Sequence, residues 1–520
     1  MKKNLFASLC FLTLTGQMAT AQTVPAYDYF KAKEVWSKSP NAALLRYTIL
    51  PVEGETQLGA YYQAGDLRHP FSAKESQGIN FSTSRYQRLK EWTYYGQFDF
   101  RTTKDKQMNM TAHTDPYRDN PYQLMDSLSG DWKKQHYDLR LKIASPGFAD
   151  DRMNAGLDVQ YNLKTGARQK DPRSLDNSST LNLSPALTYK LSERQLLGLT
   201  GIYSFYKEEL NIETIGNYQQ HYLYRLLGAG EYQMSAPYIM TAGYNRTYRG
   251  HSFGGAADYV YNADHIKWST TAGYRSGYEN AIDGTTYIQQ AGKHRYQEYQ
   301  ASSYLDWKKG KYAHQVGLEW LLKDMENTEY HQIQNADTKA YETVYSSVMS
   351  TMLRNKSTLS YLISHDSPAG LTDWWLKTAV SYHSIDNRYA NPQNKQIVDK
   401  LNVAVSFDKT YAKENRKGFA FQLSSAYDLL LSDELLYTDK SYSTNFVAKN
   451  VFIPAHQFYS VNTWTNSANV KYTFGAFGKK RNQLYIKASG WLISAMGDQG
   501  DIRKGDNRYL TQLSVGLISL

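Results

Sequence analysis

The feature that most constrains this chain is a recurring pattern of alternating apolar and polar side chains. Roughly every twenty-five residues, a stretch of about ten residues alternates in this way and is followed by either a short turn or a long polar loop. In residues 136–145, for example, Leu139 and Leu141 alternate with Arg140 and Lys142. Because successive Cβ atoms of a strand point to opposite faces, each stretch has one apolar face and one polar face. The pattern predicts either a soluble β-sandwich or a transmembrane β-barrel.

The amino terminus favours export. Lys2 and Lys3 precede a mostly apolar run from Leu5 to Leu14, and Ala19-Thr20-Ala21 offers small residues for cleavage. We expect residues 1–21 to be a secretory signal peptide, which is too short to span a bilayer. Cys10, the single cysteine of the chain, follows Leu9 rather than a small residue, so no lipid anchor is expected.

Composition and hydropathy favour the barrel. After the signal no run of about 18 apolar residues follows, so no membrane-spanning helix is expected. The chain contains 45 Tyr and 10 Trp, residues whose rings suit the boundary between acyl chains and headgroups. A Tyr-rich soluble β-protein would carry the same aromatics on cross-strand pairs. If the chain lies in a membrane, it must be a closed barrel, because lipid tolerates no unpaired backbone polar groups.

The spacing of the pattern predicts an all-β, closed, antiparallel, up-and-down transmembrane β-barrel of about twenty strands, with 16 to 22 acceptable. The expected strands include three that start near Gln220, Tyr238 and Phe458. Connections after even-numbered strands are mostly short, whereas those after odd-numbered strands include long loops at residues 103–134, 324–351 and 431–457. Barrels of the cell outer membrane place short turns in the periplasm and long loops outside, so this localisation is predicted.

The expected organisation has three parts. Residues 1–21 are the signal peptide, residues 22–54 are a periplasmic leader, and residues 55–520 are the barrel. The leader is expected to form a short helix from Tyr27 to Ser37 or a plug in the lumen. Its 33 residues are too few for the separate plug domain of a TonB-dependent transporter.

The signal ending "ATAQ", the Tyr-rich hairpins of residues 55–520 and the leader resemble the poorly characterised outer-membrane β-barrel families of Bacteroidota. The resemblance implies a genetic association with TonB-dependent transporters. The stretch "SPNAALL" at residues 39–45 is also similar to the Asn-Pro-Ala stretch of hydrophobic-compound channels, with Pro and Asn in reversed order. Many such barrels end on an aromatic residue, whereas this chain ends on Leu520.

Polar residues opposite the apolar face are expected to line the lumen, where they form either a solvated, mutually paired lining or a selectivity ladder for a polar solute. The candidate lumen-lining residues are Arg140, Lys142, Asp158, Arg225, Glu231, Arg275, Asp306, Glu319, Lys377 and Lys471.

The formal net charge of +10 suggests attraction to anionic lipopolysaccharide or anionic solutes. The expected partners are outer-membrane lipid, lipopolysaccharide, a small-molecule solute, and a TonB-dependent transporter or another envelope protein. Nucleic acid is not expected, because the basic residues are dispersed along strands and form no groove-reading motif.

No enzyme, cofactor or metal site is predicted, since no phosphate loop, zinc motif or nucleophile elbow occurs in the chain. Ser381 and His383 would face the same way on one strand, as in outer-membrane phospholipases, but in reversed order. A hydrolase would also need an orienting group and an oxyanion donor. The loop with Asp498, Asp501 and Asp506 matches no calcium motif and is interpreted as an ordinary loop tip.

These observations predict a channel or transport-associated barrel that passes a small solute. The alternative is a non-conducting structural or docking subunit beside a TonB-dependent transporter or a secretion complex, and a lesser alternative is a lipid hydrolase embedded in the barrel. An obstructed lumen would exclude simple diffusion.

Overall fold

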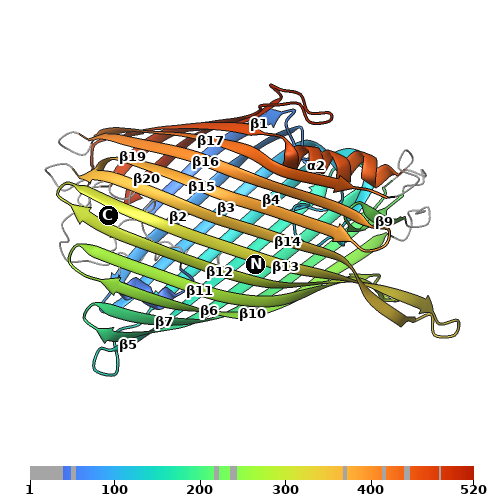
Figure 1. Cartoon of the computed structure of the whole chain (residues 1–520), viewed down its shortest axis with the longest axis horizontal. Helices are drawn as coiled ribbons and strands as arrows, with labels where there is room; N and C mark the ends of the chain where they lie inside the picture. The colour runs from blue at the N-terminus through green and yellow to red at the C-terminus, as the bar shows by residue number, and fades with distance from the viewer. Residues whose placement is uncertain are drawn as a thin grey trace, which may run out of the picture.

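The computed structural model describes residues 39–47, 54–215, 222–234, 243–366, 372–412, 417–438, 445–478 and 482–519. In these ranges the chain forms one antiparallel sheet that closes into a barrel (Figure 1). The first wall strand, β1 (Gly54–Gly65), pairs with the last, β20 (Asn507–Ser519), and closes the ring. Closure leaves the wall without a free edge. The predicted closed, antiparallel, up-and-down barrel is confirmed.

The described wall contains eighteen strands. Between β1 and β20 they are β2 (Glu75–Leu89), β3 (Trp92–Thr111), β4 (Leu124–Ala144), β5 (Met153–Arg168), β6 (Arg173–Ser192), β7 (Gln195–Glu213), β10 (Tyr244–Asn262), β11 (Ile266–Asp283), β12 (Gln289–Lys309), β13 (Tyr312–Gln334), β14 (Tyr341–Asp366), β15 (Thr372–Tyr389), β16 (Asn394–Ala412), β17 (Gly418–Leu436), β18 (Thr463–Thr473) and β19 (Gln483–Ala495).

The wall has two strands fewer than the expected twenty, within the accepted range. The surplus pair was expected near Gln220 and Tyr238, which lie outside the described residues. Since β7 pairs directly with β10, no wall strand lies between them. The intervening β8 (Tyr224–Gly228) and β9 (Glu231–Met234) are too short to cross a bilayer. A short hairpin alternates apolar and polar residues as a spanning strand does, so the pattern alone does not separate them.

The strand start predicted near Phe458 is wrong. Phe458 lies in helix α2 (Ile453–Ser460), which continues the π-helix η3 (Ala448–Phe452), and β18 begins at Thr463. Pro454 lies where α2 continues from η3, and its missing N–H removes one intrahelical hydrogen bond at this junction. None of the helices in the described parts of the chain has the length and apolar character needed to cross a membrane.

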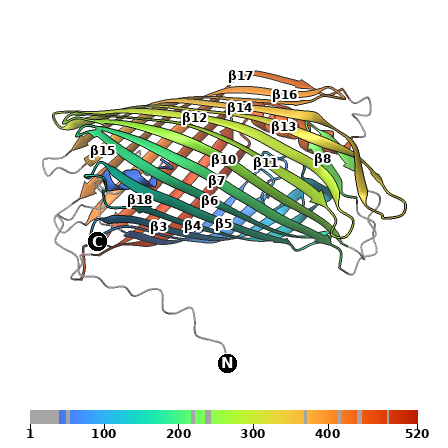
Figure 2. The same ribbon diagram turned by 90° about the horizontal axis from the view of Figure 1, so that it is seen from below.

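Two of the predicted long loops are mostly strand. β3 continues to Thr111 and β4 starts at Leu124, while β13 and β14 pair as far as Gln334 and Tyr341. The β13–β14 hairpin therefore projects beyond the neighbouring strands, as both views show (Figures 1 and 2). The 431–457 region differs, because β17 ends at Leu436 and the later described residues form η3 and the start of α2.

The two faces of the wall differ as predicted. The exposed fractions of Leu141, Leu157 and Leu318 are 43%, 38% and 54%. These leucines therefore point outward and do not pack in a common core. The next residue after each of the first two leucines points the other way, and these residues, Lys142 and Asp158, are buried on the inner face. An exterior of this kind meets acyl chains, and an interior of this kind surrounds polar groups.

Candidate functional site

The lumen contains a chain segment near the end of the barrel that carries the short turns. Residues 39–47, here called the lumen segment, include the 3-10 helix η1 (Ala42–Tyr47). The Asn41 Nδ2 donates to Asp258 Oδ2 at 3.0 Å, and the Lys142 Nζ donates to the Ser39 carbonyl at 2.9 Å. Both Asp258 and Lys142 lie on the inner face of the wall, so the segment lies inside the barrel.

The wall is shaped to accept this segment. A Cβ atom at Gly156 would lie 2.2 Å from the backbone nitrogen of Ala43, so only glycine allows this approach. The neighbouring Asn154 donates from Nδ2 to the Ala43 carbonyl at 2.8 Å. The side chains of Ala42 to Leu45 are at most 2% exposed. The lumen segment is therefore packed against β5 and not loosely threaded. The expected helix from Tyr27 to Ser37 and the expected signal peptide lie outside the described residues.

A cavity of about 330 Å³ with a mixed polar and apolar lining lies between the start of the lumen segment and the wall from β11 to β14. Hydroxyl, amide and charged groups line it, among them Gln300, Ser302, Tyr304, Glu319, Lys356 and Thr358. The Tyr304 hydroxyl donates to the Glu319 carboxylate. The cavity thus offers one cation, one anion and several neutral hydrogen-bonding groups beside apolar residues such as Trp320 and Leu321.

Near the opposite end, the connection between β3 and β4 folds inward and crosses the lumen. We call residues 112–123 the crossing loop. At its start Asp115 accepts from the Lys164 Nζ of β5 at 2.7 Å. Farther along, Asp119 accepts from the Lys323 Nζ of β13 at 2.6 Å and pairs with Arg354 of β14. The loop is therefore tied by ion pairs to strands far apart around the wall.

The middle of the crossing loop is held by Arg118. Its guanidinium pairs with Glu208 of β7 and with Glu279 of β11. It also lies 4.0 Å from the ring centroid of Tyr206, in a cation–π geometry. Both glutamates are buried, and Asn120 donates to the second of them at 2.5 Å. One cation therefore compensates two buried carboxylates on different strands.

The acidic residues of the loop are charged at neutral pH. Burial opposes ionisation, but the Lys164 ammonium outweighs it and lowers the pKa of Asp115. For Asp119, burial is likewise outweighed by Lys323 and Arg354, which lower the pKa of that carboxyl. The ties between loop and wall are therefore ionic, and they persist above the usual carboxyl pKa.

The mouth at this end is covered by two further segments. The β8–β9 hairpin and the η3–α2 helices share a buried apolar cluster with the crossing loop, in which Tyr122, Leu227 and Phe452 meet. Beside it, the His69 ring lies within 6 Å of the rings of Tyr117 and Phe458 (5.3 and 5.9 Å). Burial lowers the pKa of His69 to about 4, so this ring is neutral at pH 7.

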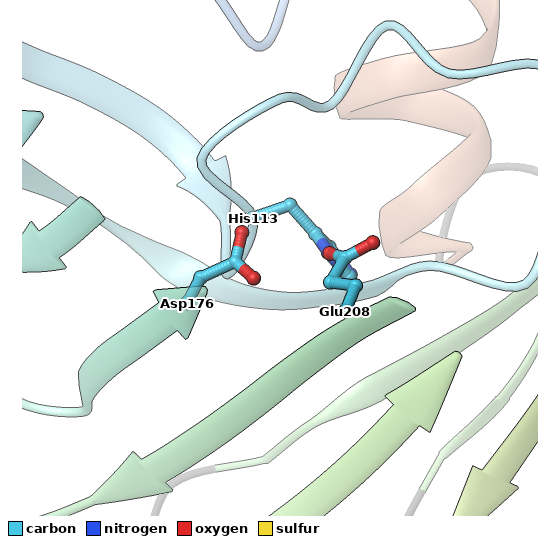
Figure 3. Close-up of side chains that lie close together, drawn as sticks. All are labelled: His113, Asp176 and Glu208. Carbon is cyan, nitrogen blue, oxygen red and sulfur yellow. The ribbon is translucent and has the colours of Figure 1, made fainter. Parts of the chain in front are cut away.

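His113, Asp176 and Glu208 lie close enough together to resemble a metal site (Figure 3). The hydrogen bonds argue against one. The His113 Nε2 accepts from the Leu124 backbone N–H at 2.9 Å, which requires the proton on Nδ1. That Nδ1 faces Glu208 Oε1 at 2.8 Å and donates to it. The imidazole has no lone pair left for a metal ion, so the group is a structural network that holds the crossing loop.

Three predicted lumen-lining residues meet at the lumen segment. Arg140 pairs with Asp158 through Nη2 and Oδ2 at 2.6 Å, and the Lys142 Nζ lies 3.7 Å from the same carboxylate. Lys142 in turn binds the carbonyl of Ser39. These residues on β4 and β5 hold the lumen segment. The alternating pattern of the strands did not predict this contact.

The other predicted residues are distributed around the barrel. Glu319 lines the cavity, Arg275 pairs with Glu298 at 2.8 Å, and Asp306 accepts from Gln315 at 3.0 Å. Lys377 lies on β15, and the Lys471 Nζ lies 4.6 Å from the Tyr485 ring centroid.

Arg225 and Glu231 do not lie on the wall, where the pattern placed them. Arg225 is on β8, and Glu231 is on β9, where it accepts from Asn394 at 2.7 Å. The reason is the misassigned strand pair, since both residues belong to the hairpin that covers the mouth.

The residues considered for hydrolysis lie on β15. Ser381 shares a hydrogen bond of 2.9 Å with Thr358, and His383 is register partner to Lys356 and Lys400. In the loop expected to be an ordinary tip, Asp498 and Asp506 accept from backbone N–H groups of Lys504 and Arg503.

Fold and lumen together define a large β-barrel with an occupied interior. A family model described as "Family of unknown function (DUF6850)" matches residues 42–519, so the chain belongs to this family. No curated protein matches the sequence. The narrower Bacteroidota assignment stays a prediction.

Solved structures similar to this chain are outer-membrane-type barrels of low sequence identity. The copper transporter OprC is 10% identical with a TM-score of 0.37, over 89% of this chain and 81% of that chain. A FadL homologue of Pseudomonas aeruginosa is 12% identical with a TM-score of 0.34, over 92% of each chain. OccK9 of Pseudomonas aeruginosa is 9% identical with a TM-score of 0.35, over 90% and 98%.

Proposed function

We propose that this chain is a gated, transport-associated barrel of the cell outer membrane, through which a small polar solute passes when the crossing loop and the lumen segment move. The observation that carries the proposal is the ionic attachment of the crossing loop to strands on several sides of the lumen. An ordinary pore lining would not need a loop stretched across it.

The apolar exterior supports a membrane location. Leu199, Phe253 and Leu513 have exposed fractions of 65%, 61% and 61%, and such outward apolar side chains recur around the wall. A soluble barrel would lose solubility with so much exposed apolar surface. The short turns and both described chain ends lie at one end of the barrel, which we place in the periplasm.

The polar side chains of the cavity support a hydrogen-bonding solute. Glu319 and Lys356 carry opposite charges, and Gln300 and Thr358 supply neutral donors and acceptors. A solute of this chemistry replaces its water shell with these groups. We propose no hydrolytic role, because the Ser381 hydroxyl is hydrogen-bonded to Thr358 at 2.9 Å and not to a histidine.

The second candidate is a non-conducting docking subunit, with a TonB-dependent transporter or another envelope protein as partner. The occupation of the lumen near both ends favours it. In that case the crossing loop would be a permanent brace, and the partner would cover the mouth.

Solute flux into proteoliposomes separates the two candidates. We expect the purified, folded chain to admit small neutral and zwitterionic solutes slowly, at rates that depend on solute chemistry and not on size alone. An absence of flux for every such solute, from a barrel that shows a folded β-sheet spectrum, would favour the docking subunit. Fast flux limited by size alone would contradict gating.

A further inference from the structure

The outer face of the barrel carries basic side chains on three of four neighbouring strands, β7, β10 and β12. On β7 the odd-numbered residues point outward, since Leu199 is 65% exposed whereas Thr200 is buried. Toward the long-loop end the outward residues after Leu199 are Gly201, Tyr203, Phe205 and then Lys207. The apolar part of the strand thus ends at Lys207.

The register places further cations beside it. Lys207 of β7 is the register partner of Arg249 of β10. On the far side of β10, Asn280 of β11 lies between Arg249 and Lys293 of β12 and is the register partner of both. Two residues along β12, Arg295 faces outward as well. We call Lys207, Arg249, Lys293 and Arg295 the outer basic patch. Lys207 and Arg249 are directly opposite on one face and therefore lie about 5 Å apart, whereas Asn280 separates Arg249 from Lys293.

Acidic groups neutralise the patch only in part. Lys207 pairs with Glu209 at 2.6 Å, and Glu326 is the register partner of Arg295. The structure shows no carboxylate paired with Arg249 or Lys293 within the described ranges, and the Lys293 Nζ lies 5.1 Å from the Tyr278 ring centroid. The patch keeps a net positive charge.

The height of the patch corresponds to lipid headgroups. Below it lie outward aromatic side chains, among them Tyr203, Phe253 and Tyr274, followed by aliphatic residues toward the short-turn end. Aromatic side chains at this position mark the boundary between acyl chains and headgroups. Cations just beyond that boundary meet headgroup phosphates.

We propose that the outer basic patch binds the phosphate groups of a phosphorylated glycolipid of the outer leaflet, with acyl chains along Tyr203 and Phe253. Arginine presents a planar fork of donors that fits phosphate, and lysine adds a point charge. The inference rests on the proposed outer-membrane location with the long loops outside. It does not rest on solute passage.

Native mass spectrometry of the full mature chain with bis-phosphorylated lipid A tests this proposal. In the variant Arg249→Gln/Lys293→Gln/Arg295→Gln we expect affinity to fall by about a hundredfold, since each cation near an anionic headgroup contributes on the order of a factor of five to ten. The matched control Arg194→Gln/Lys309→Gln/Lys311→Gln removes three charges at exposed positions of the short turns. It should bind lipid A as the wild type does.

Dephosphorylated lipid A should bind all three proteins equally weakly. Equal loss of binding in the patch variant and the control would overturn the proposal, as would tight binding of dephosphorylated lipid A. Equal competition by phosphatidylglycerol would show a general anionic surface and would overturn the assignment to a glycolipid. Solute flux should be the same in all three proteins, so failure here is distinct from failure of the proposed function.

Discussion

Replacing Arg118 with alanine is expected to raise the ion conductance of the barrel in planar bilayers several-fold. The guanidinium compensates Glu208 and Glu279, which are both buried. Without it two carboxylates face each other across the loop with no cation between them, and burial makes that arrangement costly. The crossing loop should then leave its position and admit water to the lumen.

The control for this experiment is Arg173→Ala. Arg173 pairs with Asp171 at 2.8 Å and its side chain is 45% exposed, away from the crossing loop. Both variants must show the heat-dependent gel mobility of folded barrels. Equal, low conductance of Arg118→Ala and Arg173→Ala would show that Arg118 does not hold the lumen closed.

The largest expected effect on stability belongs to Arg246. Its side chain is 1% exposed, and it donates to both oxygens of Asp283 at 2.5 and 2.7 Å and to the Tyr122 carbonyl at 3.1 Å. Arg246→Met leaves the Asp283 carboxylate buried without its main partner, because Arg225 lies 3.9 Å away. We expect the free energy of unfolding to fall by about 3 to 5 kcal/mol, measured by urea unfolding in lipid vesicles.

Two variants check the cause of that loss. In Arg246→Met/Asp283→Leu the orphaned carboxylate is also removed, so most of the stability should return. Arg388→Met breaks an exposed pair with Asp386, and its cost should be no more than about 1 kcal/mol. A cost for Arg246→Met no larger than that of Arg388→Met would contradict this explanation.

The wall was predictable from sequence because its information is local. The alternation around Leu141 and Leu318 needs no distant partner, and it set both the outward face and the strand type. The same rule failed at Phe458, which lies in a helix, and it counted a wall strand where the described chain forms the short hairpin of β8 and β9. Strand count was therefore the less certain quantity.

The contents of the lumen were not predictable in the same way. Arg118 binds Glu208 and Glu279, which are 90 and 161 residues away in the chain. Nothing in its neighbours distinguishes it from a residue of a solvated external loop. The alternation of apolar and polar residues placed Lys142 and Asp158 on the inner face. The contact of Lys142 with Ser39, however, depends on how the leader enters the barrel. Long-range ion pairs of this kind follow from the closed fold and not from local pattern.

The most direct test of gating locks the crossing loop to the wall and measures solute flux. Asp119 and Arg354 are paired across this contact, and the chain's single cysteine, Cys10, belongs to the expected signal peptide, so Asp119→Cys/Arg354→Cys supplies a defined thiol pair in the mature chain. A short bis-methanethiosulfonate should link the two thiols, and reduction should release them. We predict that flux stops in the linked protein and returns after reduction, while the reagent leaves the flux of each single-cysteine variant unchanged. Flux that continues unchanged in the fully linked protein would contradict the account, because solute would then pass without movement of the loop.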